Sequence, residues 1–262
     1  MSARAHAVSD SATMLRRNLR HVLRYPSMSV SVVAMPVIFL LLFVYVFGGT
    51  LGAGLRGAPG GGRYIDYVVP GIILLTAATA SMSTAVSVCV DMTEGIVARF
   101  RTMAIFRPAL LTGHVAGSMI LTMLSMGLVF GAALLMGFRP TAGPARWIAV
   151  IGVLAMLTLA LTWLAVALGL VAKNPESASS LPLPLMLLPF LGSGFVPANS
   201  MSGGFRWLAE NQPFTPIIET LRGLLTGTPI GHNAVLAVAW CAGITLGGYL
   251  WARAVFNRGP VH

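Results

Sequence analysis

The sequence predicts an all-α integral membrane protein, and three observations carry that prediction. Hydrophobic residues make up 56% of the 262 residues and charged residues only 9%, with a mean hydropathy of +0.82. Soluble domains carry about 25% charged residues, so lipid must surround most of this chain. Six apolar runs approach the roughly 20 residues that a helix needs to cross the hydrocarbon layer. The arginines gather at the ends of these runs, where they orient a membrane protein.

The net charge of +10 therefore indicates contact with a membrane surface rather than with nucleic acid. Arginines at the ends of apolar runs contact anionic headgroups, so we expect no nucleic-acid partner. Cys89 and Cys241 lie inside or at the end of apolar runs and have no spacing partner for a metal. We expect neither a metal site nor a disulfide framework.

The first predicted element is an interfacial helix over Met14–Arg24. Its leucines and Val22 share one face and its four arginines the opposite face. This separation lets a helix lie in the membrane surface with its guanidinium groups among phosphates. No cleavable signal peptide is evident, so we expect the apolar run that follows to be retained as a span.

Six transmembrane spans follow, and two of them contain structure-breaking residues. Pro36 in the first span is tolerated as a kink, because neighbouring helices can satisfy the freed carbonyl. The fifth span is short and rich in proline, so we expect its cytoplasmic half to be irregular. The predicted spans are Ser29–Gly49, Tyr67–Val90, Gly113–Phe138, Trp147–Ala172, Ser179–Phe195 and Asn233–Trp251.

The distribution of basic residues predicts the orientation. With the N-terminus inside, eleven Lys and Arg residues fall on the cytoplasmic side and six on the outer side. Cytoplasmic loops carry the excess of positive charge, so we expect both termini in the cytoplasm.

The segment Asp91–Leu111 is a polar interruption between the second and third spans. Helical spacing separates an apolar side from a polar side, and Pro108 stops this helix. One interpretation is a loop that rests on lipid headgroups. The other is a docking helix through which a soluble partner moves the two adjoining spans.

The outer segment before the sixth span predicts two short amphipathic helices. The first contains Phe205 and ends at Pro213, and the second opens at Thr215-Pro216. We expect this pair to dip back into the outer leaflet, where protein must shield it. Glu219 and Arg222 could form a gate, but their spacing favours a surface helical pair that contributes little.

The sequence lacks the motifs of several nucleotide-binding and catalytic sites. A Walker A loop needs a Gly-Lys-Ser/Thr end, whereas the single lysine, Lys173, lies in AKNPE. Neither H-E-x-x-H nor G-x-S-x-G occurs, and no carboxylate lies in the middle of a span. We therefore expect a transport subunit that is not an enzyme and draws its energy from another chain.

Three stretches together resemble the membrane subunit of ABC-2 type exporters of the daunorubicin/doxorubicin-resistance kind. They are Tyr64–Gly71 at the start of the second span, Asp91 to Leu111 with Gly95-Ile96 and Arg107-Pro108, and Asn211 to Gly227 with Glu219 and Arg222-Gly223-Leu224-Leu225. The resemblance covers nearly the whole chain from Leu15 to Arg258.

The resemblance implies a multi-pass permease of the bacterial plasma membrane that pairs with a second copy or a sister permease. Two ATP-binding cassette subunits would carry ATP and Mg on its cytoplasmic face, and this chain would bind no cofactor. Glu94 to Arg107 would form the coupling helix, the turn after the fourth span a second contact, and Phe205–Gly227 the re-entrant pair. The implied ATPase-contacting residues are Glu94, Gly95, Arg99, Phe100, Arg101, Met103, Arg107, Asn174 and Glu176.

Two groups of residues are candidates for the substrate path. Thr76, Thr79, Ser83 and Ser87 share one helical face, although small and hydroxyl residues also allow membrane helices to pack closely. Met186, Phe190 and Phe195 suit a loosely specified apolar ligand, although methionine is also ordinary filler. We expect a hydrophobic or amphipathic small molecule as cargo. The alternatives are a polysaccharide or lipid-linked glycan, or a membrane immunity or scaffold protein that moves nothing.

Overall fold

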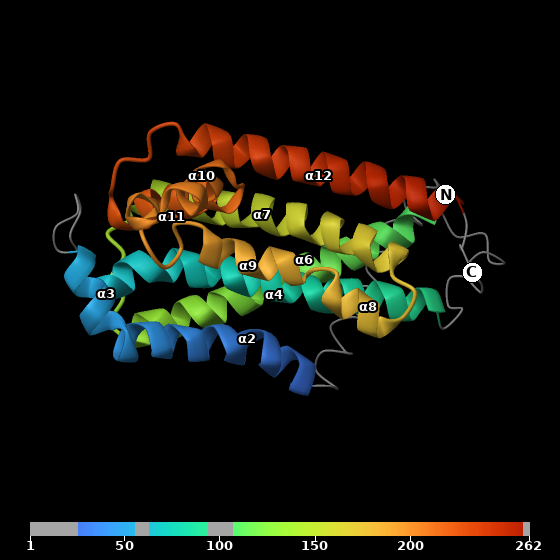
Figure 1. The fold of residues 1–262 in the computed structure, drawn as a ribbon. Helices are drawn as coiled ribbons and strands as arrows, with labels where there is room; N and C mark the ends of the chain where they lie inside the picture. Colours follow the sequence, from blue (N-terminus) through green and yellow to red (C-terminus); the bar gives the residue numbers. More distant parts are fainter. Residues whose placement is uncertain (1–25, 56–62, 94–106, 259–262) are drawn as a thin grey trace.

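The computed structural model describes residues 26–55, 63–93 and 107–258, and the regular structure in these ranges is helical, without a strand. The long helices run side by side along one axis (Figure 1). In chain order the elements are α2 (Pro26–Leu41), η1 (Leu42–Val46), α3 (Gly48–Leu55), α4 (Tyr64–Thr93), α6 (Arg107–Leu135), α7 (Pro144–Val171), α8 (Pro175–Ser180), α9 (Leu183–Leu191), η2 (Ala198–Ser200), α10 (Gly203–Asn211), α11 (Phe214–Thr226) and α12 (Asn233–Arg258). The all-α prediction is confirmed, whereas the predicted interfacial helix Met14–Arg24 lies outside the described residues.

Helix α4 is the centre of the bundle. The molecule buries 72% of its most apolar window, compared with 17% for α12 at the edge. It packs against α2, α6, α7, α8, α9 and α11. Gly169 of α7 permits one close approach, because a Cβ at that position would lie 2.5 Å from the Ala85 carbonyl oxygen. Small residues allow membrane helices to approach in this way without a hydrophobic driving force between them.

Among the described residues, four helices are long and apolar enough to cross a membrane, by length and composition. They are Tyr64–Thr93, Val115–Leu135, Pro144–Val171 and Asn233–Asn257. These helices correspond to the second, third, fourth and sixth predicted spans.

The first and fifth predicted spans have a different form. The first is the 16-residue helix α2, which contains Pro36 and continues through the π-helical turn η1. The fifth is divided into α8 and α9 by a turn at Leu181 and Pro182. A proline ring removes an amide donor and disfavours helix at the residue before it, so this interruption lies where the prolines predicted irregular backbone.

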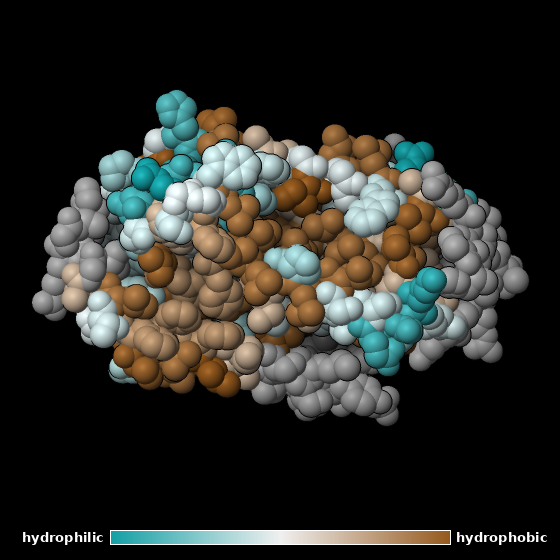
Figure 2. Space-filling view, viewed as in Figure 1, coloured by the Kyte–Doolittle hydropathy of each residue, from teal (hydrophilic) through white to brown (hydrophobic). Residues whose placement is uncertain are grey.

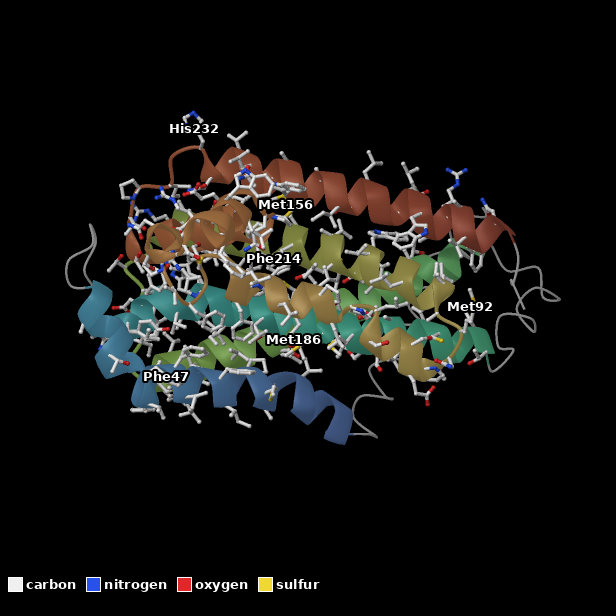
Figure 3. The ribbon with its side chains drawn as sticks, viewed as in Figure 1. Phe47, Met92, Met156, Met186, Phe214 and His232 are labelled. Atoms are coloured by element: carbon white, nitrogen blue, oxygen red, sulfur yellow. The ribbon has the colours of Figure 1, made fainter. Side chains whose placement is uncertain are left out.

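The bundle has two distinct ends, which we name by the short helices found there. At the α8 end lie the last turn of α4, the start of α6, the α7–α8 turn and the end of α12 (Figure 1). At the α11 end lie α3, α10, α11 and the start of α12. Figure 3 labels Met92 at the α8 end and Phe47 and His232 at the opposite end.

The surface between the two ends is apolar. In Figure 2, hydrophobic side chains cover the middle of the visible face, and hydrophilic side chains gather towards the ends. Large apolar side chains are exposed on the outer helices, including Ile38 of α2, Leu124 of α6 and Leu246 of α12. A contiguous exposed apolar surface of this size marks contact with lipid or with another protein.

Candidate functional site

Helix α11 is buried on two sides, which sets it apart from an amphipathic helix on a surface. Its apolar side is buried through Ile217, Ile218, Leu221 and Leu225. Its polar side is also turned inward. The polar residues on this side, Thr215, Glu219 and Arg222, follow at intervals of four and three and share one helical face. Gln212 precedes the helix and lies on the same side, because it bonds to Thr215.

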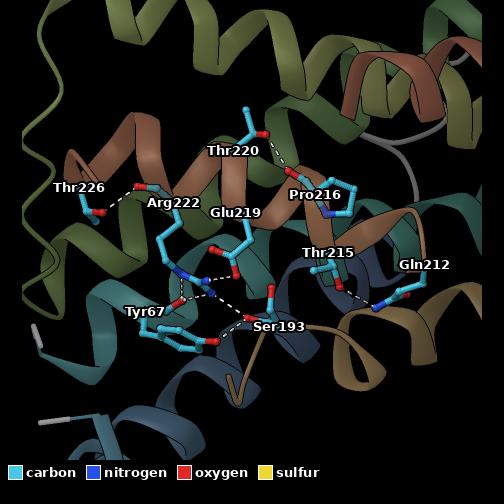
Figure 4. A network of polar contacts seen from close by, with 9 residues as sticks. All are labelled: Tyr67, Ser193, Gln212, Thr215, Pro216, Glu219, Thr220, Arg222 and Thr226. Atoms are coloured by element: carbon cyan, nitrogen blue, oxygen red, sulfur yellow. Dashed lines mark hydrogen bonds and ion pairs between the residues drawn. The ribbon is translucent and has the colours of Figure 1, made fainter. Parts of the chain in front are cut away.

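Arg222 is the centre of the polar side. Its side chain donates from Nη1 to Glu219 Oε1 at 2.6 Å and from Nη2 to the Ser193 carbonyl oxygen at 2.7 Å and the Tyr67 carbonyl oxygen at 3.1 Å. The guanidinium carbon also lies 3.7 Å from the centroid of the Tyr67 ring. Figure 4 shows these contacts converging on one guanidinium group, and the residue is only 7% exposed. Its charge is therefore both neutralised and hydrogen-bonded, as burial requires.

The turn that follows α9, residues 192–195, receives most of these donors. Tyr67 Oη donates to the Ser193 carbonyl oxygen at 2.9 Å, and Tyr64 Oη donates to the Phe195 carbonyl oxygen at 3.0 Å. The backbone of this turn lies directly on α4, since a Cβ on Gly71 would approach the Gly194 carbonyl oxygen to 2.6 Å. Side chains from α4 and α11 thus satisfy backbone carbonyl groups of this turn, as buried backbone requires.

Gln212 joins α11 to the preceding segment of the same chain. Its Nε2 donates to the Leu188 carbonyl oxygen at 2.9 Å and to Thr215 Oγ1 at 3.3 Å. The cluster of Tyr67, Ser193, Gln212, Thr215, Glu219 and Arg222, which we call the Arg222 cluster, therefore ties together α4, the end of α9 and α11.

Burial explains why the polar side of α11 needs partners. A charged side chain away from water requires an opposite charge or hydrogen bonds, and α4 and the turn after α9 supply the hydrogen bonds.

Two polar atoms of the cluster retain capacity for a further hydrogen bond. Ser193 Oγ and Gln212 Oε1 are buried and have no partner among the described residues. Buried polar atoms nearly always bind protein or ordered water, so each of these atoms can accept a water or a ligand hydrogen. Such spare capacity would also let the cluster form new hydrogen bonds if α11 moved.

The expectation that Glu219 and Arg222 form a surface pair is wrong for Arg222. The i, i+3 spacing does produce the ion pair, but α4 and the turn after α9 cover the guanidinium. The sequence reading also missed Tyr67, Ser193, Gln212 and Thr215. The regular spacing of polar residues from Gln212 to Arg222 was the available signal, because a helix expected at membrane depth must pair them.

The predicted path residues on α4 do not share one environment. Thr76 is fully buried and donates to the Ile72 carbonyl oxygen at 2.8 Å. Thr79 is partly buried, and Ser83 and Ser87 are exposed along the same face. This face therefore opens progressively towards the α8 end.

The predicted apolar residues near α9 lie in an aromatic cluster. Phe190 and Phe195 stack with ring centroids 4.4 Å apart, and Phe43 of η1 approaches Phe195 at 4.5 Å. Phe39 also contacts Phe190. Met186 is partly buried on α9 (Figure 3). The two phenylalanines thus connect the first helix to α9, and Phe195 is almost completely buried.

The residues predicted to contact an ATPase are described only in part. Residues 94–106, including Glu94, Gly95, Arg99, Phe100, Arg101 and Met103, lie outside the described residues. Arg107 is the first residue of α6. Asn174 caps α8 in a capping box with Ser177, accepting from the Ser177 amide at 2.8 Å, and Glu176 is exposed. This turn lies at the α8 end, opposite the Arg222 cluster (Figure 1).

Metal ligation is not supported in the part of the chain that the structure describes, where no group of three His, Cys, Asp or Glu side chains could hold an ion.

Comparison with known proteins gives a match over most of the chain. Residues 11–226 match the family described as ABC-2 type transporter. The chain is 29% identical over 244 residues to the daunorubicin resistance ABC transporter permease protein DrrB1 of Streptomyces coeruleorubidus, covering 92% of this chain and 84% of that protein. It is 23% identical over 215 residues to the probable doxorubicin resistance ABC transporter permease protein DrrC of Mycobacterium tuberculosis, covering 82% and 76%. The resemblance inferred from sequence motifs is confirmed.

Proposed function

This chain belongs to the ABC-2 type transporter family, and we propose that it is the membrane-spanning subunit of an ATP-driven exporter. Two separate ATP-binding cassette subunits bind ATP and Mg and supply the energy. The permease works as a pair, with a second copy of itself or with a sister permease. The family and the apolar helices make this a multi-pass membrane protein, which we place in the bacterial plasma membrane.

The observation that carries this proposal is the difference between the two ends of the bundle. The α8 end presents a rigid, capped turn with exposed Glu176 beside the end of α4 and the start of α6. The α11 end is closed by the buried Arg222 cluster. A transporter driven from one side needs a docking surface at one end and a closable barrier at the other.

We assign the α8 end to the cytoplasm and both termini with it. In this arrangement α2 with η1, and α8 with α9, make the first and fifth of six crossings. The coupling helix, Glu94 to Arg107, and the turn containing Asn174 and Glu176 contact the ATPase. Helix α11, held by Arg222, closes the outer end, and α10 and α11 form the re-entrant segment.

The cargo is a hydrophobic or amphipathic small molecule. The names of the relatives refer to daunorubicin and doxorubicin resistance, and the chain offers few charged groups between its two ends. The open face of α4 with Thr79, Ser83 and Ser87 fits a path that admits such molecules, while Thr76 is fully buried. Met186 and Phe190 of the neighbouring helix α9, together with Phe195 of the turn after it, supply an apolar wall.

The test is to purify the permease together with its ATP-binding cassette partner and to substitute residues at the two ends of the bundle. Glu176→Arg and Phe100→Ala should reduce co-purification of the ATPase or abolish substrate-stimulated hydrolysis. A truncation at a buried interface centre costs about 2 kcal/mol or more, or roughly a thirtyfold loss of affinity. Glu210→Arg, at the α11 end, is the matched control and should leave both measurements at the wild-type level. Wild-type pull-down and stimulated hydrolysis for Glu176→Arg and Phe100→Ala together would refute the docking assignment.

A further inference from the structure

The connection between α6 and α7, residues 136–143, contacts the last turn of α11. The Thr141 backbone N–H donates to the Leu225 carbonyl oxygen at 2.8 Å, and Thr141 Oγ1 donates to the same oxygen at 3.4 Å. Carbonyl groups in the last turn of a helix have no partner within that helix. Because Leu225 is completely buried, its carbonyl oxygen needs a partner from elsewhere, and Thr141, 84 residues away in sequence, provides it.

The connection is itself fixed in place where α6 ends. Gly137 has a φ of +101°, a left-handed conformation that favours glycine and turns the chain sharply. Arg63, directly before α4, donates to the Gly137 carbonyl oxygen. Arg139 donates to the Leu134 and Phe138 carbonyl oxygens at 3.0 and 3.1 Å. Thr141 is therefore attached to a well-held end of the α6–α7 pair.

Packing alone would leave α11 free to slide along its own axis. The helix packs against α4, α7 and α12. Packing between membrane helices depends largely on van der Waals contact, and packed helices can shear past one another by small amounts. A hydrogen bond at the end of a helix limits such sliding, because it depends on direction as well as on distance. The Arg222 cluster joins α11 to α4, and Thr141 joins it to α6 and α7.

The two ends of the α6–α7 pair carry different contacts. At the α8 end, α6 begins at Arg107, the last residue of the segment proposed as the coupling helix, and α7 ends just before the turn with Asn174 and Glu176 (Figure 1). Thr141 lies at the opposite end of the same pair, about 40 Å away along a helix of 28 residues.

We propose that Thr141 is a positioning residue for α11. It fixes α11 to the α6–α7 pair, so that a movement of this pair at the α8 end is transmitted to α11. Without this attachment, α6 and α7 could move while α11 stayed in place on α4. The inference rests on the proposed function, in which an ATPase at the α8 end supplies the movement.

Substitutions at Thr141 can remove its two donors in steps. Thr141 is exposed, so substituting it leaves no cavity. Thr141→Ser keeps both donors, Thr141→Val removes only the hydroxyl, and Thr141→Pro removes the amide and the hydroxyl together. Ala142→Pro is the matched control, because it places a proline in the same connection and leaves both donors of Thr141 in place.

Hydrogen–deuterium exchange of the purified full chain tests the attachment without any partner. Thr141→Pro should raise amide exchange in the last turn of α11 by roughly fivefold, the effect of losing one net hydrogen bond. Thr141→Val should raise it less, and Thr141→Ser and Ala142→Pro should match the wild type. Unchanged exchange in Thr141→Pro would overturn the inference.

Thiol labelling tests whether the attachment transmits movement. The chain carries Cys89→Ala, Cys241→Ala and Ile218→Cys, which places the single thiol at a fully buried position of α11. It is reconstituted in vesicles with its ATP-binding cassette partner. With Thr141 intact, ATP should increase labelling by a membrane-impermeant maleimide. Thr141→Pro should lose most of this increase while ATP hydrolysis continues near the wild-type rate, a separation that a purely structural role would not produce.

The remaining outcomes are also decisive. A full ATP-dependent increase in Thr141→Pro, or a parallel loss of labelling, hydrolysis and melting temperature, would overturn the inference. If Thr141→Pro does not fold, two glycines inserted between Ala142 and Gly143 lengthen the connection to α7 and should remove the same increase; a wild-type increase in that variant would count against the inference. Failure of the wild-type chain to bind an ATPase would refute the proposed function and the transmitted movement with it, whereas hydrogen exchange would still decide whether Thr141 holds α11.

Discussion

Helices α10 and α11 are consecutive, short and amphipathic, and each carries one Arg–Glu pair within a single turn. The Arg206–Glu210 pair has side chains that are 51% and 49% exposed, whereas the Arg222 side chain is 8% exposed and that of Glu219 is 32% exposed. Only Arg222 also reaches backbone carbonyl groups of α4 and of the turn after α9. The same local pattern therefore produces a surface pair in one helix and a tertiary anchor in the next.

The difference shows that the contribution of an Arg–Glu pair to the free energy of unfolding depends on how deeply the pair is buried. An exposed pair gains little because water screens it and its side chains lose freedom. Removing one partner of a buried pair leaves an uncompensated charge, and that cost is several times larger. Because α11 packs against α4 and the turn after α9, its pair has consequences for the fold that the α10 pair does not have.

The largest expected effect comes from Arg222→Met. The change removes the bonds to Tyr67 and Ser193 and leaves the Glu219 carboxylate without its partner, so unfolding free energy should fall by about 3 kcal/mol. Denaturant titration of the purified protein in detergent measures it. The double change with Glu219→Gln should recover part of the loss, because no charge is then left unpaired. No loss for Arg222→Met would mean that the cluster does not hold α11.

An intermediate loss of unfolding free energy is expected from Gly71→Ala, which disturbs the packing of the turn after α9 against α4. The added methyl would meet backbone atoms of Gly194 at 2.6 to 2.9 Å and would push the turn after α9 away from α4. Overpacking of this kind costs about 2 kcal/mol. Gly152→Ala, where nothing lies within 4 Å, is the matched control and should be neutral or slightly stabilising. Equal melting temperatures for both variants would argue against the close approach.

The smallest effect is expected from exchanging the charges of α10, Arg206→Glu with Glu210→Arg. The exposed pair can form again in the reversed order, so the unfolding free energy should change by less than about 0.5 kcal/mol. The corresponding exchange in α11 would point a carboxylate at the Ser193 carbonyl oxygen and should be strongly destabilising. Similar stability of the two exchanged proteins would remove the distinction between the helices.

Predictions from the sequence succeeded where a local pattern has one physical meaning. Apolar length fixed the second, third, fourth and sixth spans, because backbone groups in lipid must be satisfied within a helix. The turn expected after the fourth span is present, and Asn174 forms a capping box there. The motifs from Tyr64 to Gly71 and from Asn211 to Gly227 pointed to the family that the comparisons then showed.

The form of the first and fifth predicted spans could not be predicted from such patterns. Pro36 and Pro182 indicate that the regular helix is disturbed near them. Whether the chain kinks, unwinds or breaks depends on which neighbouring groups pair with the freed backbone carbonyls. The structure contains a π-helical turn after α2 and a break between α8 and α9. Phe43 of η1 contacts Phe195 of the turn after α9, although the two residues lie far apart in the chain.

The sequence by itself determined that this protein lies in a membrane, which helices are long enough to cross it, and to which family it belongs. Hydrophobic length, arginine placement and short motifs are local properties that any surrounding fold must respect. Only the tertiary structure decided that Arg222 is buried and Arg206 is not. That outcome depends on Tyr67, Ser193 and the close contact of Gly71 with Gly194, more than a hundred residues apart in sequence. Contacts across such a separation set the dielectric surroundings and hydrogen-bond partners of a charge, and these decide whether it anchors the fold or remains at the surface.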